Sequence, residues 1–221
     1  MIPMRKTGFW IAALAGVSLA AAIPPDPVEV IRAKDLELQK LLRERDAPAK
    51  TGRVKTLING IFDFEELGRR ALGPETWGKM APKQQTRFVQ AFREMIENSS
   101  VKKLDAYVND STRYDATEIN DERANVTAHV FSKGTESIVV YKLLIKRDSW
   151  KAWDLVIDDL STAGNYGDQF KKILAKNTVD GLIARLERKS QADAASKSAD
   201  NVKSKSEKSS RTGAEKSAAG T

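Results

Sequence analysis

The spacing of apolar residues predicts helices in the first half of the chain. Apolar positions recur every three or four residues over residues 28–42, over 54–61 and again over 88–108. This period places them on one face of an α-helix. Between the second and third of these segments, Asp63 and Glu66 have the spacing of a capping box, which opens a further short helix. The first half is therefore expected to be helical.

The second half of the chain has the pattern of a β-meander followed by helix. Residues 125–131, 137–147 and 150–158 are rich in β-branched and aromatic side chains, and a further short strand is expected over 112–119. The connections are short, so the strands should be antiparallel neighbours. Helical spacing returns over 166–186. The fold class expected is α+β, with a curved antiparallel sheet packed against several helices.

The two ends of the chain differ from the middle in composition. Residues 1–22 contain two basic residues, then a run of apolar and small residues that ends on alanines, which is typical of a cleaved signal peptide. The alternative is a membrane anchor, which needs about 20 apolar residues, whereas the run over 8–23 supplies 16. Residues 190–221 are rich in Ser, Ala and Lys, so a disordered tail is expected. This leaves one domain over residues 23–189.

The composition limits the kinds of chemical site that the chain can form and indicates its cellular compartment. The chain has no cysteine, which excludes disulfides, thiolate metal sites and a cysteine nucleophile. An exported protein without cysteine fits a bacterial periplasm. The formal net charge is +7, but five of these charges lie in the signal segment and in residues 189–221. The basic balance therefore does not indicate a nucleic-acid partner.

Two side chains are candidates for acid–base chemistry. His129 is the only histidine, so a metal site built from several histidines is excluded. It lies in an alternating strand, where a partly exposed histidine is the ordinary interpretation. Asp154 stands between Trp153 and Leu155, where burial could raise its pKa and make it a general base. The ordinary alternative is an aspartate that binds backbone amides of a turn. A small-molecule enzyme that uses Asp154 or His129 is thus the second functional hypothesis.

Several segments together resemble the MlaC family, also called toluene-tolerance auxiliary proteins. The segments agree in order and spacing and cover nearly the whole expected domain: residues 62–73 with Trp77, 84–94, 140–143, 150–158, 161–170 and 180–186. The resemblance implies a non-enzymatic phospholipid carrier of the periplasm on a nuclear-transport-factor-2-like cone. A monomer with no cofactor is expected. Burial of the acyl chains alone can hold the lipid while the headgroup stays in solvent, so little selectivity for the headgroup is expected.

The resemblance further implies partners and a lipid site. The partners would be the MCE-domain subunit of an inner-membrane ABC transporter and an outer-membrane lipoprotein–porin complex, between which lipid is shuttled to maintain outer-membrane asymmetry. An apolar cavity between sheet and helices would hold the acyl chains, lined by Phe92, Met95, Tyr141, Leu143, Trp150, Val156, Tyr166 and Phe170. Periodicity alone does not distinguish such a cavity from a filled core, so an adaptor with a solid core is the third hypothesis.

Overall fold

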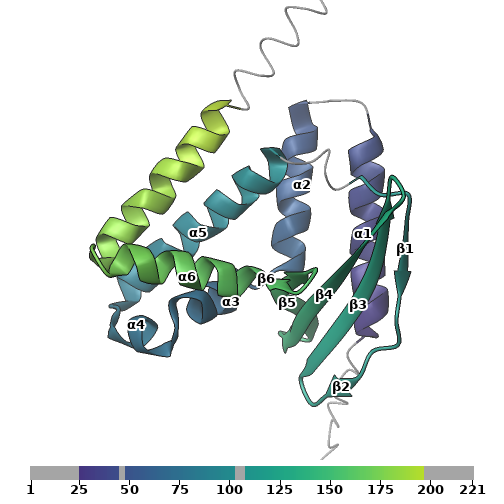
Figure 1. Cartoon of the computed structure of the whole chain (residues 1–221), viewed down its shortest axis with the longest axis horizontal. Coiled ribbons are helices and arrows are strands. Elements are labelled where there is room, and N and C mark those ends of the chain that lie inside the picture. The colour runs from purple at the N-terminus through teal and green to yellow at the C-terminus, as the bar shows by residue number, and fades with distance from the viewer. Residues whose placement is uncertain (1–24, 45–47, 103–107, 197–221) are drawn as a thin grey trace, which may run out of the picture.

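The computed structural model describes residues 25–44, 48–102 and 108–196 (Figure 1). The expected signal peptide lies outside these residues, as does the tail beyond residue 196. The helices are α1 (Pro27–Arg43), α2 (Pro48–Ile61), α3 (Phe64–Leu72), α4 (Pro74–Lys79), α5 (Pro82–Lys102), α6 (Thr162–Leu174) and a C-terminal helix over residues 179–196. None of the described helices is both long enough and apolar enough to span a bilayer.

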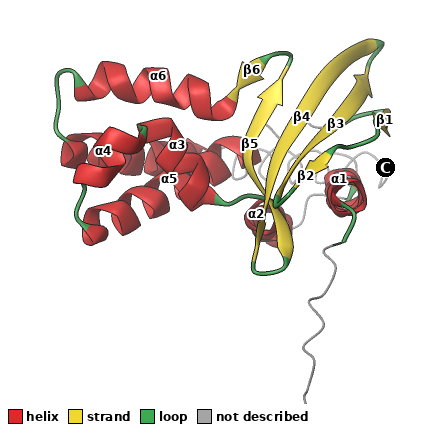
Figure 2. Cartoon of the chain, turned by 90° about the horizontal axis from the view of Figure 1, so that it is seen from below, coloured by secondary structure: helices red, strands yellow, loops and turns green. Residues whose placement is uncertain are grey.

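One curved, open antiparallel sheet lies beside the helices (Figure 2). Its strands are β1 (Ser111–Tyr114), β2 (Ile119–Asn120), β3 (Arg123–Ser132), β4 (Thr135–Lys146), β5 (Ser149–Ile157) and β6 (Leu160–Ser161). Their order is β1-β3-β4-β5-β6, and β2 pairs with β3. The predicted α+β class is confirmed. The expected short strand over 112–119 is two strands, β1 and β2, because the chain leaves the sheet between them.

Two apolar clusters account for most of the described core. The helical cluster joins α3, α5, α6 and the C-terminal helix, and its buried members include Phe64, Leu67, Phe88, Phe92, Phe170 and Leu182. The sheet cluster joins α1 to one face of the sheet, and its buried members are Ile31, Ala124, Val126, Leu143, Trp150 and Ala152. Figure 2 shows this division, with α1 and α2 under the sheet and the other helices to one side.

The start of α3 ties the two halves of the molecule together. The Asp63 carboxylate accepts hydrogen bonds from the backbone N–H groups of Glu65 and Glu66, at 3.1 and 3.2 Å. The Asp63 N–H donates to the Ala152 carbonyl of β5 at 2.8 Å. The Glu66 side chain instead pairs with Arg69 and Arg70 of its own helix. Asp63 is therefore an N-cap, as the sequence predicts, but the reciprocal half of the capping box is absent here.

The C-terminal helix continues beyond the expected domain boundary. Ser190, the expected first residue of the disordered tail, is buried, and the Asn98 side-chain amide donates to both its carbonyl and its hydroxyl oxygen. One turn later, the Ser99 hydroxyl donates to the Asp193 carboxylate at 2.9 Å. These polar contacts with α5 hold residues 190–196 in helix, so the boundary inferred from composition is too early. A boundary inferred from composition depends on how many apolar residues a segment can bury. It does not take account of polar side-chain contacts such as these.

The close packing of α6 on α3 depends on Gly167. A Cβ atom at this position would lie 3.1 Å from the Ala71 carbonyl oxygen, which belongs to a helix backbone and cannot rotate away. We expect Gly167→Val to lower the free energy of unfolding by about 1–3 kcal/mol, because overpacking costs this much. Gly52→Ala in α2 is the control, since its added Cβ meets no atom within 4 Å. Equal urea midpoints for the two variants would contradict the close contact.

Candidate functional site

Four of the eight expected lining residues lie in the helical cluster. Phe92, Met95 and Phe170 are at most 2% exposed, and Tyr166 packs against them from α6. The Phe92 ring lies 4.9 Å from the ring of Tyr166 and 5.4 Å from that of Phe170, in both cases edge to face. Aromatic rings at such distances and angles are typical of a filled core. In the described structure these four side chains pack on one another.

The other four expected residues lie on the sheet. Leu143 and Trp150 are buried in the sheet cluster, and Tyr141 packs against it. The Trp150 indole N–H donates to the Pro25 carbonyl at 2.7 Å, which fixes the chain just before α1. Val156 pairs with Val140 across the β4–β5 ladder and is half-buried. The structure therefore places four of the eight residues in or against the helical cluster and three in or against the sheet cluster, leaves Val156 outside both, and does not bring the eight together around one cavity.

Phe62 lies where the helical and sheet clusters meet. It stands between α2 and α3, is half-buried, and packs against both clusters. Its ring centroid lies 5.7 Å from that of Phe64, a buried member of the helical cluster. On its other side it forms a parallel backbone bridge with Ala152 of β5. We call this junction the Phe62 seam.

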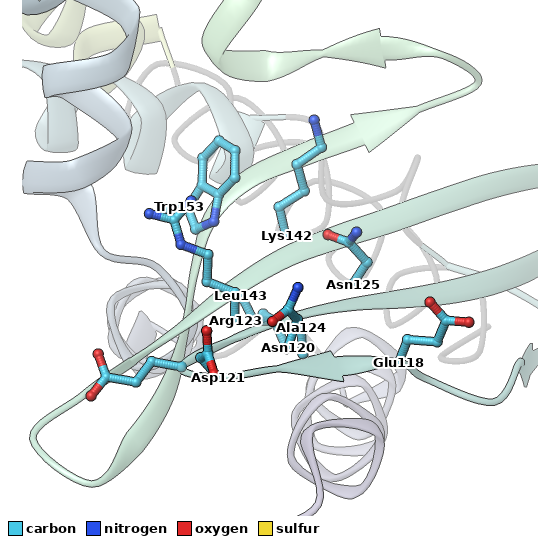
Figure 3. A pocket seen from close by; sticks show the side chains of 10 residues that line it. Glu118, Asn120, Asp121, Arg123, Ala124, Asn125, Lys142, Leu143 and Trp153 are labelled. Atoms are coloured by element: carbon cyan, nitrogen blue, oxygen red, sulfur yellow. The ribbon is translucent and has the colours of Figure 1, made fainter.

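A hollow of about 870 Å³ opens on the sheet. We call it the sheet hollow (Figure 3); it is lined by Glu118, Asn120, Asp121, Glu122, Arg123, Ala124, Asn125, Lys142, Leu143 and Trp153. Leu143 is the only one of the eight expected residues among these ten. The hollow has the volume of a small-molecule site, and seven of its ten lining residues carry charged or amide side chains.

The indole of Trp153 connects the sheet hollow to the helices. The Arg70 guanidinium of α3 stacks over the indole at 3.8 Å, and the Lys142 ammonium lies 5.4 Å from the ring centroid. Trp153 lies where the β4–β5 register shifts, next to Ala152 at the Phe62 seam. Hydrogen bonds from Arg69 and then Arg70 hold the pKa of Glu66 below its ordinary value, although burial opposes them. The hollow and the seam are thus neighbours.

Asp154 has a structural role in this fold. It is 1% exposed, and its two carboxylate oxygens accept from the Ser161 hydroxyl at 2.7 Å and from the Ala163 N–H at 2.9 Å. Both donors lie at the start of α6, where a carboxylate is favoured by the helix dipole. The Lys142 ammonium approaches at 3.7 Å. The turn-binding alternative weighed for Asp154 is therefore the one that the structure supports.

His129 is held between two carboxylates on the sheet. Its Nε2 lies 2.9 Å from Asp115, and its Nδ1 lies 2.6 Å from Glu136. The hydrogen bond to Asp115, and after it the one to Glu136, raises the pKa of His129 above its ordinary value. With both ring nitrogens occupied, the imidazole has no free nitrogen that could take a proton from a substrate.

The His129 arrangement predicts a specific pH dependence. Because the folded pKa lies above the unfolded value of about 6.5, the imidazolium should stabilise the fold fully below pH 6.5, and this contribution should be lost as the pH rises through the folded pKa. The unfolding midpoint of the wild-type protein should exceed that of His129→Gln by more at pH 5.5 than at pH 8.5. Since the chain has one histidine, an NMR titration gives its pKa directly, and a value below 6.5 would contradict the arrangement.

Comparison with known proteins assigns the fold to a family. The model of the MlaC protein family matches residues 32–188. The chain belongs to the MlaC family. A search of the curated proteins finds no match. Among solved structures, this MlaC-family chain is similar to the phospholipid-binding protein from Ralstonia solanacearum, solved in complex with a phospholipid. The TM-score is 0.66 at 20% identity, over 76% of this chain and 99% of that chain.

Some residues that shape the site were not singled out from the sequence of this MlaC-family chain. Phe62 lies within a segment that resembles the family, but its position between two clusters depends on the tertiary fold. Arg123 and Asn125 alternate with the buried Ala124 and Val126 along β3. That alternation of polar and apolar residues is visible in the sequence and could have indicated a polar surface on the other face of the strand.

Proposed function

We propose that this protein is a phospholipid carrier. The observation that carries the proposal is the similarity of fold to a protein that was solved with a bound phospholipid, 99% of whose chain is covered by the match. Membership of the MlaC family agrees with it. The carrier holds acyl chains by burial alone, since each methylene removed from water contributes about 0.8 kcal/mol. It therefore requires no catalytic group.

The acyl chains are proposed to enter at the Phe62 seam. Separation of the sheet from the helices there would open an apolar space between the two clusters, with the side chains expected to line a cavity on both sides of it. Half-buried Tyr141 and Tyr166, which pack against the sheet cluster and the helical cluster respectively, would contact lipid with the least rearrangement. The more deeply buried residues would become part of the wall only as the clusters move apart.

The contacts of the two acid–base candidates favour a carrier over an enzyme. The Asp154 carboxylate accepts a hydrogen bond at the start of α6. Both ring nitrogens of His129 are hydrogen-bonded to carboxylates. An adaptor that binds only proteins is the remaining alternative, and it would take up no lipid.

The setting proposed for the carrier is the periplasm. Export through a cleaved signal peptide is supported by the sequence of residues 1–22 and by the family. The proposed partners are the MCE-domain subunit of an inner-membrane ABC transporter and an outer-membrane lipoprotein–porin complex. Shuttling between these two would maintain the lipid asymmetry of the outer membrane. These partners follow from the family resemblance alone.

Vesicle capture tests the carrier and its seam together. Delipidated protein is mixed with vesicles that contain a fluorescent phospholipid, and the lipid that remains with protein after the vesicles are removed is measured. We expect capture by the wild type, and a loss of at least about fivefold for Phe62→Asp, because a charge in the path of the acyl chains opposes burial.

Phe62→Leu is the matched control, since it keeps the position apolar and should retain capture. Circular dichroism of all three proteins checks that the half-buried substitution leaves the fold intact. Capture by folded Phe62→Asp at the wild-type level would reject the seam as the path. Absence of capture by the wild type would reject the carrier.

A further inference from the structure

Basic side chains gather where α1 ends and α2 begins. Among the described residues from 40 to 55, five are basic and one is acidic. We call the five basic residues the basic corner: Lys40, Arg43, Lys50, Arg53 and Lys55. Residues 23–196 as a whole contain 29 basic and 27 acidic residues. The surplus of positive charge in the domain therefore lies at this corner, and the remainder of the domain is close to neutral.

Several charges of the basic corner are not neutralised by the protein itself. The Arg43 guanidinium donates to the Asn109 carbonyl at 2.8 Å, and the Lys55 ammonium donates to the side-chain oxygen of Asn98. Both acceptors are uncharged. Lys40 is exposed in the last turn of α1. Within the part of the chain that the structure describes, none of these three basic residues forms an ion pair with a carboxylate.

The single described carboxylate at the corner lies among three cations. Glu44 accepts two hydrogen bonds from the Arg53 guanidinium, at 2.6 and 3.2 Å. This hydrogen bonding is the main cause that lowers the pKa of Glu44, and the charges of Lys40 and Lys50 act in the same direction. One carboxylate among so many cations leaves the corner with a net positive field.

The C-terminal helix ends beside the basic corner, and a basic segment follows it in the sequence. Lys55 of α2 contacts Asn98 of α5, and the Asn98 amide donates to Ser190 of the C-terminal helix. Figure 1 shows the ends of α1, α5 and the C-terminal helix and the start of α2 on one side of the molecule. Residues 197–221 contain six basic and three acidic residues. The chain therefore adds positive charge next to the corner.

We propose that the basic corner docks the protein on a bilayer surface that contains anionic phospholipid. The negative potential of such a surface attracts Lys and Arg side chains without a shaped pocket. A bilayer fits better than a pocket of another protein, because residues 197–221 have no aromatic and one large aliphatic residue with which to fill a pocket. The choice of a bilayer rests on the proposed carrier function, since a carrier collects and delivers its lipid at membranes.

Vesicle sedimentation tests the docking surface. Residues 23–221 are mixed with vesicles of phosphatidylcholine alone, or of phosphatidylcholine and phosphatidylglycerol in equal parts, and the protein that sediments with the vesicles is measured. At low ionic strength, the wild type should bind the mixed vesicles at least about tenfold more tightly than the neutral ones. This difference should disappear at about 0.5 M NaCl, because salt screens charges over a few ångströms.

Charge variants locate the binding surface. Lys40→Gln with Arg53→Gln should weaken binding to the mixed vesicles by about tenfold or more, because each basic residue near an anionic surface contributes up to about a factor of five. Both side chains are exposed, and circular dichroism checks the fold. Lys171→Gln with Lys172→Gln is the matched control. It removes two exposed lysines of α6, away from the corner in Figure 1, and should leave binding unchanged.

The basic segment is tested in the same way. Lys203→Gln with Lys205→Gln should also weaken binding to the mixed vesicles. If only this pair does so and the corner pair binds like the wild type, residues 197–221 bind the bilayer without the corner, and the proposal is overturned. Equal binding of the wild type to both kinds of vesicle would overturn it too, as would an equal loss in the control pair.

Lipid capture by the same proteins separates the docking surface from the carrier. If the wild type captures lipid but shows no preference for anionic vesicles, the docking surface is rejected and the carrier stands. If the wild type sediments with anionic vesicles in a salt-dependent way but captures no lipid, the carrier is rejected and the basic corner stands as a surface for anionic bilayers.

Discussion

Phe92→Ala should lower the free energy of unfolding by about 3–5 kcal/mol. Phe92 has no exposed surface, and its ring lies within 6 Å of the rings of Phe88, Tyr166 and Phe170. Truncation leaves a cavity that these large rings cannot fill, which adds to the lost transfer free energy. Urea unfolding of the delipidated protein measures the change.

Leu36→Ala is the control for this prediction. It also shortens a large aliphatic side chain, but at a position of α1 that is 64% exposed, so its effect should be within about 0.5 kcal/mol. A loss below about 1 kcal/mol for Phe92→Ala would mean that the helical cluster is loosely packed around this ring. Phe92 would then fit the lining role expected from the sequence better than the core position seen in the structure.

Asp154→Ala should be the second most destabilising change, by about 2–4 kcal/mol. The substitution leaves the Ser161 hydroxyl and the Ala163 N–H without their acceptor at the start of α6, and buried donors without partners cost about 1–3 kcal/mol each. Asp154→Asn should lose less, because its carbonyl oxygen can still accept from Ala163. Chemical denaturation of the three proteins gives the order directly.

Asp159→Asn is the matched control for Asp154. It changes a nearby carboxylate at an exposed turn, where a positive φ of 66° suits asparagine, so stability should be unchanged. Lipid capture by Asp154→Asn should remain at the wild-type level when the protein is folded. A fully stable Asp154→Asn protein that no longer captures lipid would contradict a purely structural role for Asp154.

Local patterns predicted the elements of this fold well, because each depends on few residues. The N-cap at Asp63 and the antiparallel meander follow from spacing, from residue type and from short connections. The division of the apolar residues could not be predicted in this way. The sequence pattern predicts that Phe92 and Leu143 are both buried. Only the tertiary arrangement places them in different clusters.

The site was harder to predict than the fold for the same reason. His129 lacks any carboxylate within six residues in the sequence, yet the sheet brings Asp115 and Glu136 to its two nitrogens. Likewise, Arg123 and Lys142 are far apart in the chain and meet on one face only because β3 and β4 pair. The period of apolar residues and the composition predict which residues are buried. They do not predict which polar side chains come together in the fold.

Native mass spectrometry with organic extraction tests the central claim most directly. Residues 23–221 are produced in bacteria and purified without detergent, so that any lipid acquired in the cell stays bound. The account predicts co-purified phospholipid at about one molecule per protein. A mass without lipid, together with no uptake from vesicles, would contradict the carrier and favour the protein adaptor.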